Sequence, residues 1–265
     1  MEMLGYIVCL LVGLSLGLIG AGGGILTVPV MVYLFHIPVL LSTTYSLFIV
    51  GAASLVGAWY QYRRDHVNLR IAVIFCLLSM SVVFVIRHYV LPRIPGDLFV
   101  VSGVTVTMSF LCMVMFSMLM ILAALAMILK KQPGTAGAEK GRSNLHILWC
   151  AILVGLLTGF LGAGGGFILI PSLVLFLGLS MKDAVGTSLL IIAMNSLTGF
   201  TMDLNHVTIQ WPLLAGITLI AAGGLFLGTI ISKRISAEQL KLFFGWFVLA
   251  VAVGILIKEL TTYTR

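Results

Sequence analysis

Long apolar stretches separated by short polar segments run along the whole chain. They cover approximately residues 4–35, 40–62, 69–90, 98–129, 145–177, 184–202, 207–232 and 240–260. A membrane-spanning helix needs about 20 apolar residues, because it rises ~1.5 Å per residue across a hydrocarbon core of ~30 Å. The pattern therefore predicts an all-α integral membrane protein that crosses the bilayer several times.

Composition supports this class and excludes others. The chain is 61% hydrophobic and only 9% charged, with a mean hydropathy of +1.20, whereas a soluble domain is about a quarter charged. The net charge of +7 comes from basic residues in short loops, which is typical of a multi-pass membrane protein surrounded by lipid. No basic stripe or nucleic-acid-binding motif is present, so a nucleic-acid partner is not expected. Residues 1–3 lack a basic leader, so the first apolar stretch is expected to stay in the mature protein.

The two halves of the chain are copies of each other around one polar segment. Residues 1–130 form the first predicted transmembrane repeat, residues 131–143 a polar linker, and residues 144–265 the second repeat. The segment 17–29 aligns with 159–171, and the same constant offset superposes Ser46 on Ser188 and Ser54 on Ser196. An internal repeat of this kind is typical of transporters.

Each half contains the block Gly-Ala-Gly-Gly-Gly, at residues 20–24 and 162–166. Each glycine costs roughly 1 kcal/mol relative to alanine inside a helix, so the helix is predicted to break there. The half-helix after each break begins with free N–H groups and a positive dipole end, and no Cβ keeps an anion away. The blocks therefore predict an uncharged anion-binding cradle inside the membrane. The alternative is that they only allow close helix packing, as other small-residue motifs do.

Candidate substrate-binding residues are the glycines of the two blocks and the polar residues that follow them. Ser46 and Ser188 are repeat-related, while Thr187 and Asn195 add a hydroxyl and an amide in the second half. Any one of these side chains fits equally well a hydrogen bond between helices. The full candidate set is Gly20, Gly22, Gly23, Gly24, Ser46, Gly162, Gly164, Gly165, Gly166, Thr187, Ser188 and Asn195.

Other reactive side chains suggest no second site. Every Asp, Glu, Lys and Arg lies at or beyond the end of an apolar stretch, so no charged group is expected at mid-membrane. The four cysteines lie singly and the five histidines lie at stretch ends, so no metal site and no cofactor are expected. Without a catalytic constellation, the chain is not expected to be an enzyme.

The positions of the basic residues distinguish two topologies. If each glycine-broken stretch crosses the membrane once, the halves are parallel, and Lys and Arg divide nine to six between the two faces. If each broken stretch enters and returns, the halves are inverted, and the division becomes eleven to four. The second division agrees better with the positive-inside rule. The sequence therefore favours inverted repeats, each with three to four spanning helices, with the linker cytoplasmic and both chain ends outside.

The paired glycine blocks, each followed by a proline, and the segment Gly186-Thr187-Ser188-Leu189 make the sequence similar to the TauE/SafE family of bacterial sulfite exporters. The similarity covers essentially the whole chain, although the first half has Thr44-Tyr45-Ser46 where the second has Gly186-Thr187-Ser188. It implies a secondary transporter that moves small sulfur-containing anions, such as sulfite or organosulfonates, across the bacterial inner membrane.

A channel-like anion pore is the alternative function. The resemblance leaves the anion, the direction of transport, the coupling by protons or other ions, and a homo-oligomeric state open.

Overall fold

The structure is a computed structural model of the 265-residue chain. It describes residues 2–19, 24–94, 97–101, 104–129, 144–162, 169–170, 173, 177–204, 207–231 and 237–263. The predicted linker 131–143 lies outside these residues, as does most of the segment that follows the second glycine block.

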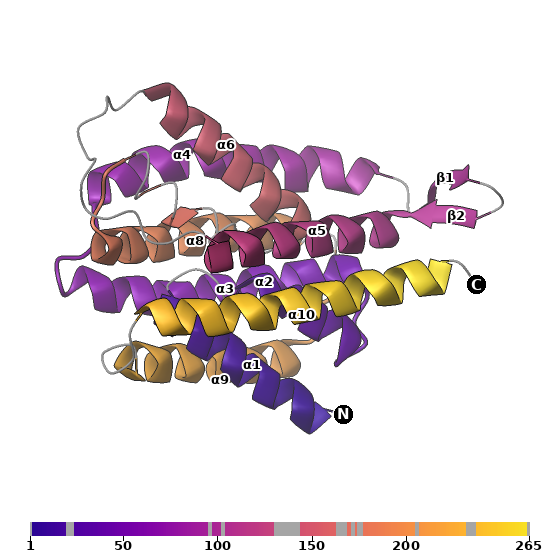
Figure 1. Ribbon diagram of the computed structural model, residues 1–265. Coiled ribbons are helices and arrows are strands. Elements are labelled where there is room, and N and C mark those ends of the chain that lie inside the picture. The colour runs from indigo at the N-terminus through magenta and orange to yellow at the C-terminus, as the bar shows by residue number, and fades with distance from the viewer. Residues whose placement is uncertain are drawn as a thin grey trace.

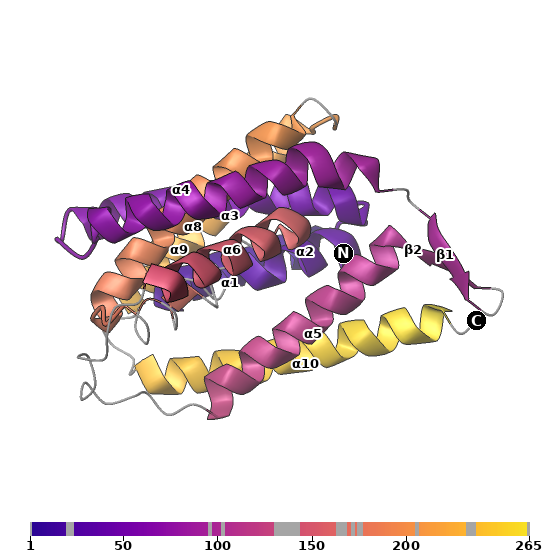
Figure 2. The same ribbon diagram turned by 90° about the horizontal axis from the view of Figure 1, so that it is seen from above.

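The described residues form a bundle of helices with one short β-hairpin at its end (Figure 1). The first half contains α1 (Glu2–Ile19), α2 (Gly24–Tyr33), α3 (Val39–Tyr62), α4 (Leu69–Val85), the short helical turns η1 (Ile86–Val90) and η2 (Leu91–Arg93), strands β1 (Asp97–Val101) and β2 (Val104–Thr107), and α5 (Met108–Leu129). The second half contains α6 (Asn144–Leu161), α8 (Met181–Asp203), α9 (Trp211–Ile231) and α10 (Ala237–Tyr263). Helices α5 and α10 pack against each other on the side of the bundle away from α4 (Figure 2).

The membrane architecture expected from the apolar stretches is confirmed. Within the described ranges, four helical stretches are long and apolar enough to cross a bilayer: Val39–Tyr62, Leu69–Arg93, Lys182–Asp203 and Trp211–Ile231. Their outer faces expose large apolar side chains such as Leu77 and Leu219, which water would not solvate well but lipid tails do. The protein is therefore a helical, multi-pass membrane protein.

One predicted span differs in detail from the structure. Residues 98–129 read as a single apolar stretch, but β1 and β2 pair antiparallel and α5 begins only at Met108. The physical reason is composition, because residues 100–107 are dominated by β-branched Val and Thr, which favour extended backbone over helix. The hairpin extends beyond the bundle at the end where the C-terminus lies (Figure 1).

The first glycine-broken stretch folds back on itself. The start of α1 lies beside the end of α2, because the ring of Phe35 fills the space next to Gly5, where an added Cβ would be 2.7 Å away. Just before Phe35, Tyr33 donates a hydrogen bond of 2.6 Å to Glu259 of α10, and the Lys258 ammonium lies 4.1 Å from the Tyr33 ring centroid. Both ends of this stretch therefore lie at the same end of the bundle, as an entering and returning segment requires.

Helices α3 and α8 hold corresponding places in the two halves and run antiparallel through the middle of the bundle. The end of α3 meets the start of α8, where His66 Nδ1 lies 3.3 Å from Asp183 Oδ1. The start of α3 meets the end of α8, where Thr44 donates a hydrogen bond of 2.6 Å to Asp203. Both helices are mostly buried inside the protein, so each half supplies a large part of the other's core.

Contacts between these two helices recur at the repeat offset that superposes Ser46 on Ser188. An added Cβ at Gly57 of α3 would lie 3.1 Å from the side chain of Leu189 in α8. The residues related to these by the repeat are Gly199 and Leu47, and there an added Cβ would lie 2.9 Å from the leucine side chain. At these positions, a contact of residue i with residue j is therefore also made by their repeat-related counterparts, with the two halves exchanged.

The outer helices follow the same rule and approach each other closely. An added Cβ at Gly13 of α1 would lie 2.0 Å from the carbonyl oxygen of Ala221 in α9. The repeat-related pair is Gly155 of α6 and Ser79 of α4, where the corresponding distance is 2.7 Å. At both places the backbones pack against each other without room for a side chain, as small-residue interfaces in membranes do.

Candidate functional site

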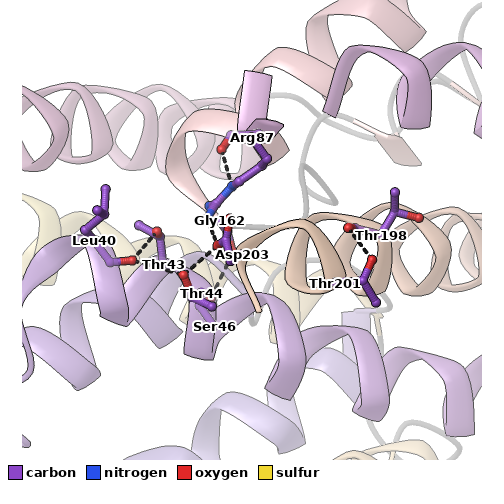
Figure 3. Close-up of polar contacts among 10 residues, drawn as sticks. Leu40, Thr43, Thr44, Ser46, Arg87, Gly162, Thr198, Thr201 and Asp203 are labelled. Carbon is purple, nitrogen blue, oxygen red and sulfur yellow. Dashed lines mark hydrogen bonds and ion pairs between the residues drawn. The ribbon is translucent and has the colours of Figure 1, made fainter. Parts of the chain in front are cut away.

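The second glycine block begins in contact with α3 of the other half. Gly162 ends α6 with a φ of +67°, a conformation that suits glycine, and its N–H donates a 3.0 Å hydrogen bond to the Thr158 carbonyl. Ser46 donates a 2.9 Å hydrogen bond to the Gly162 carbonyl. An added Cβ at Gly162 would lie 2.6 Å from the Thr43 carbonyl oxygen. Of the predicted site residues, the structure thus brings Ser46 and Gly162 together (Figure 3).

The other glycines of the candidate site can be placed only in part. Gly24 begins α2, immediately after the first break. The remaining members lie outside the described residues: Gly20, Gly22, Gly23, Gly164, Gly165 and Gly166. The cradle between the two blocks therefore stays a prediction.

The polar candidates of α8 make hydrogen bonds within the helix bundle. Ser188 donates to the Val185 carbonyl of its own helix at 2.8 Å. Thr187 accepts a 3.0 Å hydrogen bond from the backbone N–H of Asn68, and Asn195 accepts one of 2.8 Å from Ser79. The bonds of Thr187 and Asn195 connect α8 to α4 or to Asn68, the residue that caps α4. A hydrogen bond between helices is the alternative role that the sequence analysis gave for these side chains.

Two repeat-related hydroxyls are buried without a partner among the described residues. Ser54 of α3 and Ser196 of α8 are fully buried, and neither hydroxyl has a hydrogen-bond partner in that part of the chain; the same holds for Nδ2 of Asn195. Ser196 lies at the contact between α3 and α8, because an added Cβ at Gly51 would be 3.2 Å from its Cβ. A buried polar group without a partner costs about 1–3 kcal/mol. The repeat offset was the signal in the sequence that marked this pair.

The structure contains a buried ion pair within a helical segment, although the sequence analysis predicted no charge inside such a segment. Arg87 and Asp203 are only 1% and 6% exposed, and they form a direct ion pair between α4's continuation and α8. The apolar stretch read from the sequence ends at residue 90, but the helical backbone continues through η1 and η2 to Arg93. Arg87 therefore lies inside the spanning segment Leu69–Arg93 rather than at its end, and the expectation for this residue is wrong.

Residues of α3 and α6 also make hydrogen bonds to the ion pair (Figure 3). Arg87 Nε donates a 2.7 Å hydrogen bond to the Gly159 carbonyl of α6, and Nη1 donates to Asp203 Oδ2. Thr44 of α3 donates to the same carboxylate oxygen at 2.6 Å. The third guanidinium nitrogen, Nη2, has no partner among the described residues. Removing one member of such a pair typically costs about 3–5 kcal/mol, because a buried charge is left uncompensated.

Two cavities lie near the start of α3, at the end of the bundle where Arg87 meets Asp203. One, of about 220 Å³, is lined by Leu40, Thr44, Arg87, Leu91, Pro92, Asp203 and Val207. The other, of about 520 Å³, is lined by Leu34, Phe35, His36, Ile37, Pro38, Leu41, Tyr45, Gln210 and Leu213. Tyr45 is buried there and its hydroxyl accepts a 2.8 Å hydrogen bond from the Gln210 backbone N–H. The described residues contain no group of three or more His, Cys, Asp or Glu side chains that would hold a metal ion.

Comparison with known proteins gives the family of the chain. The family described as "Sulfite exporter TauE/SafE" matches residues 5–255. A "Probable membrane transporter protein" of Xylella fastidiosa strain Temecula1 is 30% identical over 260 residues, which cover 93% of this chain and 91% of the relative. The "Probable membrane transporter protein YdhB" of Bacillus subtilis strain 168 is 27% identical over 246 residues, covering 90% of this chain and 94% of the relative. No solved structure matches the chain at a significant level. The chain therefore belongs to the TauE/SafE sulfite exporter family of multi-pass membrane transporters.

Proposed function

We propose that this chain is a secondary transporter that moves a small sulfur-containing anion, such as sulfite or an organosulfonate, across the bacterial inner membrane by alternating access. The anion binds between the two glycine breaks, mainly to backbone N–H groups of residues 22–24 and 164–166. The observation that carries the proposal is the hydrogen bond from Ser46 to Gly162. This bond connects the start of the second break to α3, a central helix of the other half. The break therefore begins inside the protein rather than against lipid, which non-helical backbone at membrane depth requires.

A neutral cradle suits a transported anion. Backbone N–H groups at a helix start offer partial positive charge without a fixed cation. Such dipoles bind an oxyanion and also release it, whereas an unpaired buried arginine would hold it strongly. The family to which the chain belongs is named for sulfite export, and the three oxygens of sulfite each accept hydrogen bonds of this kind.

An inverted arrangement of the halves is part of the proposal. The packing supports it, because repeat-related contacts such as Gly57 with Leu189 and Gly199 with Leu47 occur between antiparallel helices. A two-fold axis that relates two antiparallel spanning helices must lie in the plane of the membrane. Inverted repeats related by such an axis provide two equivalent but opposite conformations, which is the basis of alternating access around a central site.

Counterflow in proteoliposomes tests the function and separates it from a pore. Vesicles loaded with unlabelled sulfite are diluted into a trace of labelled sulfite, and uptake of the label is followed. A carrier accumulates label transiently because internal sulfite drives exchange, and we expect this result with sulfite or a sulfonate. Uptake that does not respond to internal substrate would indicate the channel-like pore, and no uptake of any sulfur anion would overturn the proposal.

A further inference from the structure

The buried ion pair joins the two repeats, and the repeat-related positions carry no charge. At the repeat offset, Arg87 corresponds to Thr229 and Asp203 corresponds to Gln61, so both charged positions are neutral in the counterpart. The third member, Thr44, corresponds to Gly186. The two ends of the pseudo-symmetric bundle therefore differ in charge at equivalent places.

The counterpart residues occupy equivalent positions in the structure, at the other end of α3 and α8. An added Cβ at Gly186 would lie 3.1 Å from the Cβ of Gln61, as Thr44 lies against Asp203. An added Cβ at Gly17 would lie 2.8 Å from the Thr229 backbone nitrogen, as Arg87 lies against Gly159. At the other end of the bundle, the same helices therefore pack together with neutral residues at the positions of Arg87 and Asp203. Packing of the helices alone does not require the ion pair.

Arg87, whose Nη2 has no partner among the described residues, lines a cavity whose size suits a small ion. Nε and Nη1 of Arg87 donate hydrogen bonds to Gly159 and Asp203. Nη2 is buried and has no partner among the described residues. The Arg87 side chain lines the cavity of about 220 Å³. That volume is below the ~300–1,000 Å³ of ordinary organic-ligand pockets. A guanidinium nitrogen with two unused N–H groups is a strong donor to an oxyanion.

The ion pair is also connected to Gly162, where the second glycine block begins. Thr44, which holds Asp203, is two positions before Ser46, which holds Gly162. On the other side, the carbonyl that accepts from Arg87 belongs to Gly159, three positions before Gly162. The ion pair and the start of the break are therefore connected through both α3 and α6.

We propose that the cavity lined by Arg87 is an entrance site that binds a small oxyanion before it reaches the glycine breaks. This inference rests on the proposed function for the class of anion. Nη2 of Arg87 binds the anion, and Asp203 offsets the positive charge of Arg87, so that the anion is held weakly enough to move on. Among the described residues, the neutral counterpart at Gln61 and Thr229 offers no equivalent site.

Other charged and titratable groups near the pair are few in the part of the chain that the structure describes. Cys112 of α5 is a buried, free cysteine on that side of the pair. His88, the next residue along, is exposed and stacks on Phe84. At the opposite end, the His66–Asp183 pair near Gly186 is about a third exposed, so it is not a buried equivalent of Arg87 and Asp203.

Protection of an introduced thiol tests the entrance site directly. Leu40 lines the cavity and is 49% exposed, so Leu40→Cys, in a background without the four native cysteines, gives a reporter at its rim. The rate of reaction with N-ethylmaleimide is measured in purified, membrane-reconstituted protein with increasing methanesulfonate, and with gluconate at equal ionic strength as the reference. We expect methanesulfonate to slow the reaction in a saturable way.

Two variants move the result in opposite directions. Arg87→Thr combined with Asp203→Gln introduces the residues of the other half and should abolish the protection. Asp203→Asn removes the neutralising charge and should lower the half-protecting concentration by roughly tenfold, as one more charge-assisted hydrogen bond would. Thr229→Val, at the repeat-related position, is the matched control and should leave protection unchanged. Gel filtration and thermal unfolding check that each variant is folded. Asp203→Asn leaves the buried Arg87 uncompensated, so the double variant decides the matter if Asp203→Asn does not fold.

The outcomes separate this inference from the proposed function. Protection that persists in the double variant, that is unchanged in Asp203→Asn, or that never occurs would overturn the entrance site, even if counterflow of sulfite is normal. Protection that depends on Arg87 supports the entrance site, even if counterflow fails and the transport proposal falls.

Discussion

Replacing Gly162 with alanine should weaken the contact between the second glycine block and α3. The φ of +67° at Gly162 costs a residue with a Cβ about 1–2 kcal/mol. The added methyl would also lie 2.6 Å from the Thr43 carbonyl oxygen and 2.9 Å from the Thr43 Cα, and overpacking of this kind costs typically about 1–3 kcal/mol. Because the obstacle is backbone, the chain at residue 162 must move away from α3, which stretches the 2.9 Å hydrogen bond from Ser46.

The expected result is a loss of about 2–5 kcal/mol in the free energy of unfolding, together with a strong reduction in transport. The measurement is the apparent unfolding temperature of purified protein in one detergent, alongside counterflow in proteoliposomes at equal reconstitution. The matched control is Gly216→Ala. Gly216 is a helical glycine with no other heavy atom within 4 Å of an added Cβ, so alanine there should stabilise α9 by up to ~1 kcal/mol.

Unchanged unfolding temperature and unchanged transport in Gly162→Ala would refute this reasoning. The positive φ and the close approach to Thr43 would then not constrain the break. A fall in both variants alike would instead point to a general sensitivity of the bundle to added methyl groups.

Three further predictions concern the breaks, the buried hydroxyls and the topology. Gly23→Val and Gly165→Val should each abolish transport at normal expression and monodispersity, because a branched side chain blocks the approach of the anion and restricts φ; normal counterflow in both would mean that these glycines serve packing. Ser46→Ala should cost on the order of 0.5–1.5 kcal/mol of unfolding free energy through the lost bond to Gly162, whereas Ser54→Ala should cost less, because its hydroxyl has no partner among the described residues. Cysteine labelling of intact cells should find the segment Lys130–Ser143 inaccessible from outside and both chain ends accessible; a labelled linker would reverse the orientation.

Properties that depend on neighbouring residues and on the internal repeat could be predicted from the sequence. Apolar length predicts spanning helices, because no other solvent than lipid suits such stretches. The constant repeat offset marked the two halves and paired Ser46 with Ser188 and Ser54 with Ser196. Local composition misled at residues 98–107, where the hydropathy suggested a helix and the β-branched residues form a hairpin.

Contacts between distant residues could not be predicted and are known from the three-dimensional packing alone. Arg87 and Asp203 are 116 residues apart and come from different halves, and each on its own looked like an ordinary charge at the end of a stretch. Whether such a charge is solvated or buried depends on the packing of α3, α4, α6 and α8 around it, and no local periodicity encodes this packing. The same holds for the bond from Ser46 to Gly162 and for the return of the first broken stretch from Gly5 to Phe35. These contacts arise because the helices of one half fill spaces in the other, and that depends on three-dimensional shape rather than on the order of residues along either half.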